Sequence, residues 1–295
     1  MKIEIHGLNK LYRGGVHALK DLDLTIPNGM FGLMGPNGAG KTTLMRILAG
    51  ILRPTSGTLQ IGEYDGNTEK GRTNVKRMLG YLPQDLGVYP DLSAREFLDY
   101  IGILKCMDER KTRQQRVNEL LEVVSLSDVA NRKLKTFSSG MKRRIGIAQA
   151  LLNDPRLLIV DEPTGGLDPE ERIRFRNLLS ELAGDRTVLL STHIVEDIAQ
   201  TCRNLAVLKK GQIVFQGTTV EMITDARNKV WTVTTDGIKP EGNLTVVSTM
   251  HLGTSVQYRV VGELASQDGA VATEPSLEDS YVWLMRELPL VSEIP

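Results

Sequence analysis

The chain has 295 residues, 41% of them apolar and 24% charged, and its 36 basic side chains balance its 36 acidic ones. This length and composition are ordinary for a globular protein with one large domain and a small one. Zero net charge argues against a general nucleic-acid binder, and the lack of any run of about 18 apolar residues predicts no membrane-spanning helix.

The first residues and the cysteines predict a cytosolic protein. The stretch from Met1 to His6 alternates as a strand and lacks the layout of a secretion signal. Cys106 and Cys202 lie far apart and form no metal-binding cluster, so we expect two reduced thiols.

Short apolar strands alternate with helical patterns up to about residue 222. The strands that precede Gly35 and Glu162 are continuous apolar runs, which is typical of strands covered by helices on both faces. The pattern predicts an α/β doubly wound domain over residues 1–222. Its predicted strands are Ile3–Leu8, Leu22–Ile26, Met30–Met34, Leu157–Asp161, Thr187–Ser191 and Asn204–Lys209.

Two further regions differ from this core in their pattern of strands and helices. Between about residues 92 and 152 helices replace strands, beginning with a capping box of Ser93 and Glu96, which predicts an inserted helical subdomain. Residues 226–295 predict a small α+β appendage. Its expected elements are strands at Val230–Thr235, Leu244–Ser248 and Val256–Val261 and a helix at Leu277–Glu287 capped by Ser276 with Asp279.

A glycine-rich loop follows one of the apolar strands and opens a helix. It fills the pattern G-x-x-x-x-G-K-[ST] with Gly35, Pro36, Asn37, Gly38, Ala39, Gly40, Lys41, Thr42 and Thr43. Backbone N–H groups of such a loop face phosphate oxygens, and the N-terminus of the helix adds partial positive charge. Lys41 can bridge the β- and γ-phosphates, and the Thr42 hydroxyl is placed to bind Mg²⁺.

Two carboxylates end a second buried strand. Asp161 and Glu162 follow four apolar residues, which puts Asp161 at the carboxyl edge of the sheet, where ligands bind in α/β folds. Asp161 can hold Mg²⁺ through its water shell, and Glu162 can polarise an attacking water.

Several further motifs resemble those of the ATP-binding subunits of ABC transporters. The segment Phe137–Lys142, with Ser138, Ser139, Gly140 and Met141, resembles the family's signature, usually L-S-G-G-Q. Gln84 resembles the Q-loop glutamine, and His193, which follows a strand end, resembles the switch histidine. Asp168, in the segment from Gly166 to Pro169, resembles the D-loop aspartate, and Tyr12 falls where the family stacks an aromatic ring on adenine. The motifs occur in the family's order across residues 1 to about 222.

The resemblance implies a P-loop NTPase core of the ABC ATPase type that binds ATP and Mg²⁺ and hydrolyses ATP. It implies catalytic roles for Glu162, His193, Gln84 and Lys41 and Mg²⁺ ligation by Thr42, Gln84 and Asp161. Two copies would meet head-to-tail, each signature facing the partner's ATP. The dimer, expected to be a homodimer, would power a permease on a separate chain, without nucleic acid, from the cytosolic face of the membrane. The appendage resembles that of exporter-type systems, and the transported substrate is not readable.

The signature departs from the family's pattern at two positions. Ser139 replaces the first glycine and Met141 replaces the glutamine. We expect the Cβ of Ser139 either to hold the signature back from the partner's phosphate or to demand a backbone conformation that glycine reaches more easily.

Four alternatives stay open for individual residues. Asp168 with Pro169 is also a good helix start, Tyr12 also fits a surface tyrosine, and His193 also fits a core or capping role. The apolar residues between Gln84 and Glu96 predict a docking groove for a short helix of the membrane subunit, and the alternative is a loop packed on its own subdomain. These apolar residues are Leu86, Val88, Tyr89 and Leu92.

Two alternatives stay open for the whole chain. One is a soluble ABC-type ATPase that acts on chromosomes or ribosomes, although the chain has one phosphate loop and no sustained heptads. The other is a nucleotide-binding regulator that does not hydrolyse ATP.

Overall fold

The computed structural model describes residues 1–165, 167–263 and 270–287. The chain forms two compact units, Met1–Gln216 and Gly217–Pro295. The second unit thus begins a few residues before the break that the sequence suggests, because α8 (Thr219–Asp225) packs with α9 (Leu277–Glu287) inside it.

The larger unit is built on a six-stranded sheet in the order β10-β9-β3-β8-β7-β6. Its strands are β3 (Gly29–Met34), β6 (Leu79–Leu82), β7 (Leu157–Asp161), β8 (Thr187–Thr192), β9 (Asn204–Lys209) and β10 (Gln212–Thr218). The pairs β3–β8, β3–β9, β7–β8 and β6–β7 are parallel. β7 is buried along its whole length and β3 is buried from Phe31 to Met34, which confirms the prediction from their continuous apolar runs.

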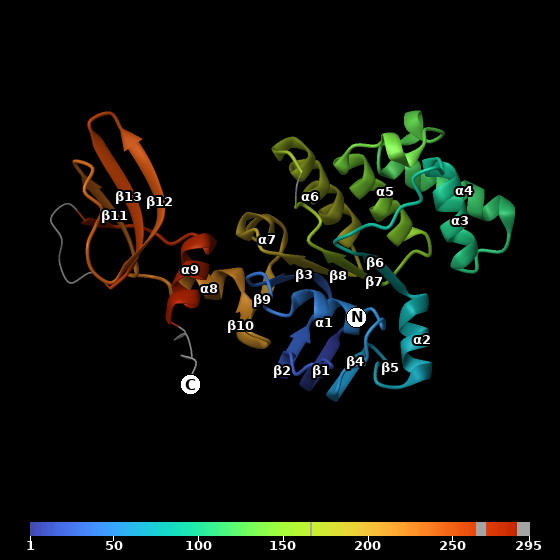
Figure 1. Ribbon diagram of the computed structural model, residues 1–295, viewed down its shortest axis with the longest axis horizontal. Coiled ribbons are helices and arrows are strands. Elements are labelled where there is room, and N and C mark those ends of the chain that lie inside the picture. The colour runs from blue at the N-terminus through green and yellow to red at the C-terminus, as the bar shows by residue number, and fades with distance from the viewer. Residues whose placement is uncertain (166, 264–269, 288–295) are drawn as a thin grey trace. The chain divides into compact units, whose positions relative to one another are not determined.

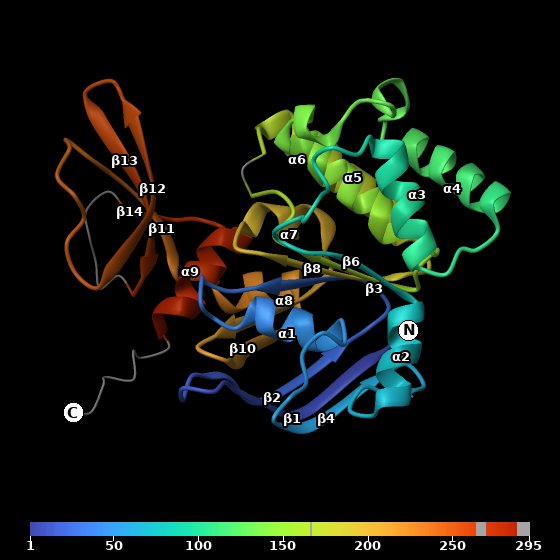
Figure 2. The ribbon, with the colours of Figure 1, turned by 45° about the vertical axis from the view of Figure 1, so that its right-hand side comes forward.

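Helices cover both faces of this sheet (Figures 1 and 2). One face carries α1 (Lys41–Leu48), and the opposite face carries α5 (Ser139–Leu151), α6 (Pro169–Ala183) and α7 (Val195–Thr201). The α/β class expected from the sequence is therefore confirmed.

The first two predicted strands belong to a different sheet from the one expected. β1 (Ile3–Leu11) and β2 (His17–Ile26) join β4 (Ser56–Ile61) and β5 (Tyr64–Asp65) in an antiparallel sheet of order β2-β1-β4-β5. The turn between β1 and β2 is too short for the helical crossover that parallel pairing needs. This sheet lies on the other side of α1, and a common core joins the two sheets through α1 (Figure 2). The predicted strand ranges do not include β4, β5, β6 or β10.

The helices predicted between residues 92 and 152 are α3 (Ala94–Leu104), α4 (Arg110–Val123) and α5, with 3₁₀ turns at Ser127–Val129 and Leu134–Thr136. Ser93 and Glu96 form the expected capping box at the start of α3. An apolar stripe along α4 and its C-cap is buried, namely Val117, Leu120, Leu121 and Val124. The short helix α2 (Glu69–Arg77) lies between β5 and β6 in the chain. Among the described residues no helix is long and apolar enough to cross a membrane.

The second unit is a four-stranded antiparallel sheet with two helices. The sheet has the order β12-β13-β11-β14, formed by β11 (Val230–Thr235), β12 (Leu244–Leu252), β13 (Ser255–Gly262) and β14 (Ala270–Ala272). The predicted strands are present, β12 runs longer than expected, and β14 was not predicted. Trp283 of α9 packs with Ala226, Val230 and Val261 in a core of its own.

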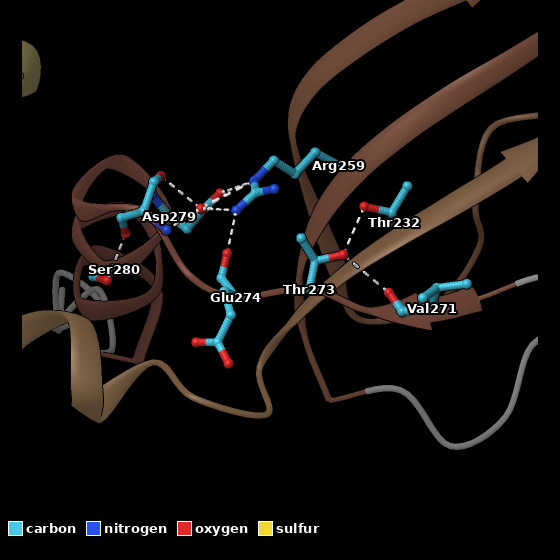
Figure 3. Close-up of polar contacts among 8 residues, drawn as sticks. Thr232, Arg259, Val271, Thr273, Glu274, Asp279 and Ser280 are labelled. Carbon is cyan, nitrogen blue, oxygen red and sulfur yellow. Dashed lines mark hydrogen bonds and ion pairs between the residues drawn. The ribbon is translucent and has the colours of Figure 1, made fainter.

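An ion pair ties α9 to this sheet. Figure 3 shows Arg259 of β13 reaching the fully buried carboxylate of Asp279, with Nη2 and Oδ2 2.6 Å apart. The backbone N–H and hydroxyl of Ser276 also donate to Asp279, which completes the predicted helix cap. Burial raises the pKa of Asp279, but the hydrogen bonds from Arg259 and Ser276 outweigh it and hold the pKa below its usual value.

We expect Asp279→Asn to destabilise the second unit by about 2 kcal/mol at pH 7, because it leaves the Arg259 charge without its partner. Both tryptophans of the chain, Trp231 and Trp283, lie in this unit, so tryptophan fluorescence during urea unfolding reports on it alone. The depressed pKa gives stability that is present above pH about 4 and is lost as the pH falls through the folded-state value. The difference in unfolding free energy between wild type and Asp279→Asn should therefore shrink at acidic pH. The exposed Asp236→Asn is the control, and equal loss in both variants would contradict the role of the ion pair.

Candidate active site

The predicted motifs meet at one edge of the parallel sheet. The neighbours β3, β8, β7 and β6 end in register, so their carboxyl ends lie side by side. The loop from Gly35 follows β3, His193 follows β8, Asp161 and Glu162 lie at the end of β7, and Gln84 follows β6. Because ligands bind outside the carboxyl ends of such strands, this edge is the candidate active site.

The phosphate loop is held tightly by its neighbours. Gly35 and Gly40 have φ values of 151° and 111°, and a Cβ on them would lie 2.2 Å from the Leu208 carbonyl oxygen and 2.6 Å from that of Ala18. Only glycine fits these two positions. Helix α1 begins directly after Gly40, so its first N–H groups are open to an anion at the loop.

Lys41 lies inside the loop with its ammonium group almost fully buried. Its Nζ donates to the carbonyl oxygens of Gly35, at 2.8 Å, and Pro36, at 3.1 Å, and lies 3.5 Å from Glu162 Oε1. Two carbonyl oxygens and one carboxylate thus hold the buried ammonium at the mouth of the loop. It can accept phosphate oxygens there with little rearrangement.

Glu162 is the centre of the cluster, and its side chain is 12% exposed. Gln84 Nε2 donates to its Oε2 at 3.2 Å, and His193 Nδ1 lies 3.5 Å from the same oxygen. Glu162 therefore contacts all three other side chains that the resemblance marks as catalytic. Its φ of 47° is unusual for a residue with a Cβ, and such conformations concentrate at functional sites. His193 is 46% exposed, so the alternative of a core histidine is wrong.

Asp161 is fully buried at the end of β7, and neither of its carboxylate oxygens has a hydrogen-bond partner among the described residues. Burial raises its pKa above the usual value, and the nearby hydroxyls of Thr42 and Ser191 oppose that rise without cancelling it. An unpartnered carboxylate beside a threonine hydroxyl is the set of oxygen ligands that a hydrated Mg²⁺ uses. These residues fit Mg²⁺, which usually needs one or two carboxylates and a phosphate rather than a cage.

An open cavity of about 660 Å³ lies over the loop. Tyr12 forms part of its wall, with its hydroxyl 3.3 Å from Thr43 Oγ1 and Lys10 Nζ over its ring. Tyr12 is half-buried in this wall, so it is not a free surface tyrosine. The cavity is lined by Asn37, Gly38, Ala39, Gly40, Lys41, Thr42, Thr43, Gln84 and Glu162 together with Tyr12.

Five further lining residues were not identified from the sequence: Val16, His17, Ala18, Lys20 and Lys210. They come from the start of β2 and from the turn between β9 and β10. The backbone of Gly211 in that turn donates to the Ala39 carbonyl and accepts from Lys20, which brings both segments to the loop. No motif marks these residues, because chain segments almost 200 residues apart meet only in the folded sheet.

The signature residues lie outside this cavity. Ser138 is the N-cap of α5 and accepts a hydrogen bond from the Met141 N–H at 3.1 Å. Gly140 packs so closely on Glu171 of α6 that a Cβ would lie 2.7 Å from a carboxylate oxygen. Ser138 and Ser139 are exposed, so the first turn of the helix is accessible.

Ser139 is the first residue of α5 and has a helical backbone conformation. It is not among the residues with a positive φ. The expectation that its Cβ demands a conformation that glycine reaches more easily is therefore wrong, because a residue with a Cβ adopts helical φ and ψ values without strain. Only the expectation that its Cβ limits an approaching phosphate stays as a prediction.

Asp168 caps α6, its Oδ1 accepting from the Glu171 N–H at 2.8 Å. The capping role proposed as an alternative is thus present, and the D-loop role stays a prediction. Gly166 of the same segment lies outside the described residues. Arg143 was not predicted, yet its Nη1 donates to the Gln84 carbonyl at 2.5 Å and so holds the Q-loop against α5.

Comparison with known proteins agrees with this geometry. The sequence profile described as ABC transporter matches residues 19–165. The ABC transporter ATP-binding protein YxlF of Bacillus subtilis is 38% identical over 233 residues, which cover 78% of this chain and 76% of that protein. The Nod factor export ATP-binding protein I of Cupriavidus metallidurans is 40% identical, over 75% of this chain and 72% of that protein.

The fold comparison leads to the same family. The dimeric, post-hydrolysis structure of the ATP-binding cassette MJ0796 bound to ADP and Pi superposes with a TM-score of 0.67 at 28% identity, covering 73% of this chain and 98% of that one. The phosphate loop and the carboxylates after β7 thus occur in a chain whose relatives are named as ABC transporter ATP-binding proteins. The chain belongs to the family of ABC transporter ATP-binding proteins and is the ATP-binding, ATP-hydrolysing subunit of an ABC transporter.

Proposed function

We propose that two copies of this chain close around two ATP molecules with Mg²⁺ and power export through a permease on a separate chain. The observation that carries the catalytic part is the Glu162 carboxylate, which contacts Lys41, Gln84 and His193 at the edge of the phosphate loop.

ATP fits the cavity with its phosphates on the loop. The N–H groups of residues 38–43 and Lys41 would hold the β- and γ-phosphates, and the Tyr12 ring would stack on adenine. Thr42, Asp161 and Gln84 would hold Mg²⁺, which neutralises phosphate charge when bound.

Glu162 is the proposed general base. A water beside the γ-phosphate would give its proton to Glu162 as its oxygen bonds to phosphorus, and the bond to the ADP oxygen breaks. Gln84 and His193 contact the same carboxylate oxygen and would orient the water and the γ-phosphate. Lys41 would stabilise the charge that develops on the phosphate oxygens.

The exposed signature supports the dimer. The first turn of α5 at Ser138 lies outside its own cavity, and its N–H groups point to the open N-terminal end of the helix. A second copy in head-to-tail orientation would bring this end to the γ-phosphate of the partner. The relative MJ0796 is described as a dimer bound to ADP and Pi.

A permease partner is proposed from the family and from an apolar surface on the helical subdomain. Tyr89 and Tyr100 pack edge to face, with ring centroids 5.4 Å apart, yet are 49% and 39% exposed. They line a hollow with Pro90 and Leu92. Leu86, Val88 and Leu92 are half-buried, so they agree with the alternative of a loop packed on its own subdomain.

The exposed tyrosine pair fits a short helix of the permease. Docking there would hold this chain at the cytosolic face of the membrane through its partner. Export is proposed because a relative is named as an export ATP-binding protein.

Glu162→Gln should separate binding from turnover. We expect ATP affinity close to wild type, hydrolysis lower by about 10²-fold or more, and accumulation of an ATP-bound dimer. Phosphate release, titration with labelled ATP and size-exclusion chromatography measure the three quantities. Glu69→Gln, on an exposed helix start, is the control. Hydrolysis within a few-fold of wild type would exclude Glu162 as the base.

Asp161→Asn tests the Mg²⁺ assignment. Because burial raises the pKa of Asp161, its ionised form at pH 7 destabilises the fold, so the nucleotide-free variant should be more stable by about 1 kcal/mol. This difference should vanish as the pH falls through the raised pKa. Calorimetry should show that Mg²⁺ no longer adds to the stabilisation by ATP. The exposed Asp128→Asn is the control, and a wild-type response of Asp161→Asn to Mg²⁺ would contradict the assignment.

Tyr89→Asp and Tyr100→Asp test the docking surface. We expect each to keep ATP binding while abolishing co-purification with the permease from membranes, since a charge at a buried apolar contact is unfavourable. Ile51→Asp, at a residue that is 57% exposed after α1, is the matched control and should co-purify. Loss of folding in the tyrosine variants would favour the loop alternative instead.

A further inference from the structure

A buried polar cluster lies behind the active site. Thr164 Oγ1 donates to Asp197 Oδ2 at 2.5 Å, and Arg176 Nη1 donates to Asp197 Oδ1 at 3.4 Å. The exposed fractions of these residues are 2% for Thr164, 7% for Arg176 and 1% for Asp197. None of the three lines the nucleotide cavity.

The cluster joins the chain segments that carry the two central site residues. Thr164 lies two residues after Glu162, and Asp197 lies four residues after His193. Arg176 comes from α6, which begins at the Asp168 cap. Two contacts therefore join the segment after β7 to the segment after β8. One is the Glu162–His193 contact at 3.5 Å, and the other is the buried Thr164–Asp197 hydrogen bond.

The hydrogen bonds to Asp197 restrict the rotation of α7, which apolar packing alone restricts less. Ile198 seats α7 on β3, where a Cβ on Gly32 would lie 2.6 Å from it. Packing on β3, β8 and α6 sets the distance of α7 from the sheet but fixes its rotation less well, since dispersion is non-directional. The hydrogen bonds to the Asp197 carboxylate are directional, and charge makes them strong in a dry site. They therefore fix the rotation of α7 and, with it, the direction in which the preceding His193 points.

We propose that Thr164 and Asp197, with Arg176, are positioning residues that set the His193–Glu162 geometry for ATP hydrolysis. This inference rests on the catalytic roles proposed for Glu162 and His193. Loosening the cluster should lower turnover without changing how ATP binds, because none of its three residues lines the nucleotide cavity.

The main test removes one hydroxyl and keeps the shape. Thr164→Val in the full chain should lower kcat for Mg-ATP by about tenfold and leave KM within about twofold. Thr164→Ser, which keeps the donor, should stay within about threefold of wild-type kcat. Thr187→Val is the matched control: Thr187 is equally buried, its hydroxyl donates to the Met1 carbonyl, and it lies at the opposite end of β8 from His193.

Thermal unfolding of the two valine variants separates positioning from stability. Both lose a buried hydroxyl contact, so both should melt lower, yet only Thr164→Val should lose turnover. An equal fall in kcat in both would show a general loss of stability and overturn the proposal. Should Thr164→Val fail to fold, Asp197→Asn keeps the volume and an acceptor while removing the charge, and the same fall in kcat is expected from it.

A double-mutant cycle shows whether the effect passes through His193. Thr164→Val added to His193→Ala should lower kcat by no more than about twofold further, because there is no longer an imidazole to position. A further tenfold loss would overturn the proposal. If His193→Ala and Glu162→Gln turn over much more slowly than wild type while Thr164→Val turns over like wild type, the inference fails and the proposed function stands. Wild-type turnover in both His193→Ala and Glu162→Gln would contradict the proposed function and this inference together.

Discussion

The Glu162 carboxylate is the contact on which the active site depends. It is nearly buried and lies between the Lys41 ammonium, the Gln84 amide and the His193 ring, so three chain segments converge on one group. The left-handed backbone at Glu162 turns the chain away from β7 and presents the carboxylate to the loop rather than to the sheet. A backbone hydrogen bond stabilises that conformation, since the Glu162 N–H donates to the Ser191 carbonyl of β8.

The rigidity of the phosphate loop has a similar origin. Its glycines lie against the backbone carbonyls of Ala18 and Leu208, and the turn at Gly211 bonds to Ala39. The loop is therefore enclosed by β2 and by the β9–β10 turn, and its N–H groups are arranged before any phosphate arrives. Preorganised donors of this kind need no rearrangement when charge develops. The same enclosure supplies the lysines of the cavity wall.

Buried carboxylates occur in both compact units, and they differ in whether they have hydrogen-bond partners. In the larger unit the buried Asp161 is left without a partner, which suits a ligand, whereas Asp197 is fully engaged by Thr164 and Arg176. In the second unit Asp279 is engaged by Arg259 and Ser276 and serves only to join helix and sheet. Asp161 thus stays available to a ligand, whereas Asp197 and Asp279 are held in ion pairs.

The sequence by itself determined the phosphate loop, the carboxylates after β7, the helical region and the class of protein. These features are local: a glycine pattern between a strand and a helix, a buried run that ends in acids, and a periodic apolar stripe each act within one segment. The α/β fold class could also be predicted, because strands and helices alternate along the chain.

Tertiary structure alone decided the rest. It placed β1 and β2 in a separate antiparallel sheet, put Lys20 and Lys210 at the cavity, and left Ser139 in unstrained helix. It also paired Thr164 with Asp197. Each of these outcomes depends on which distant segments become neighbours in the sheet, and no local pattern of residues encodes a contact between positions that are far apart in the chain.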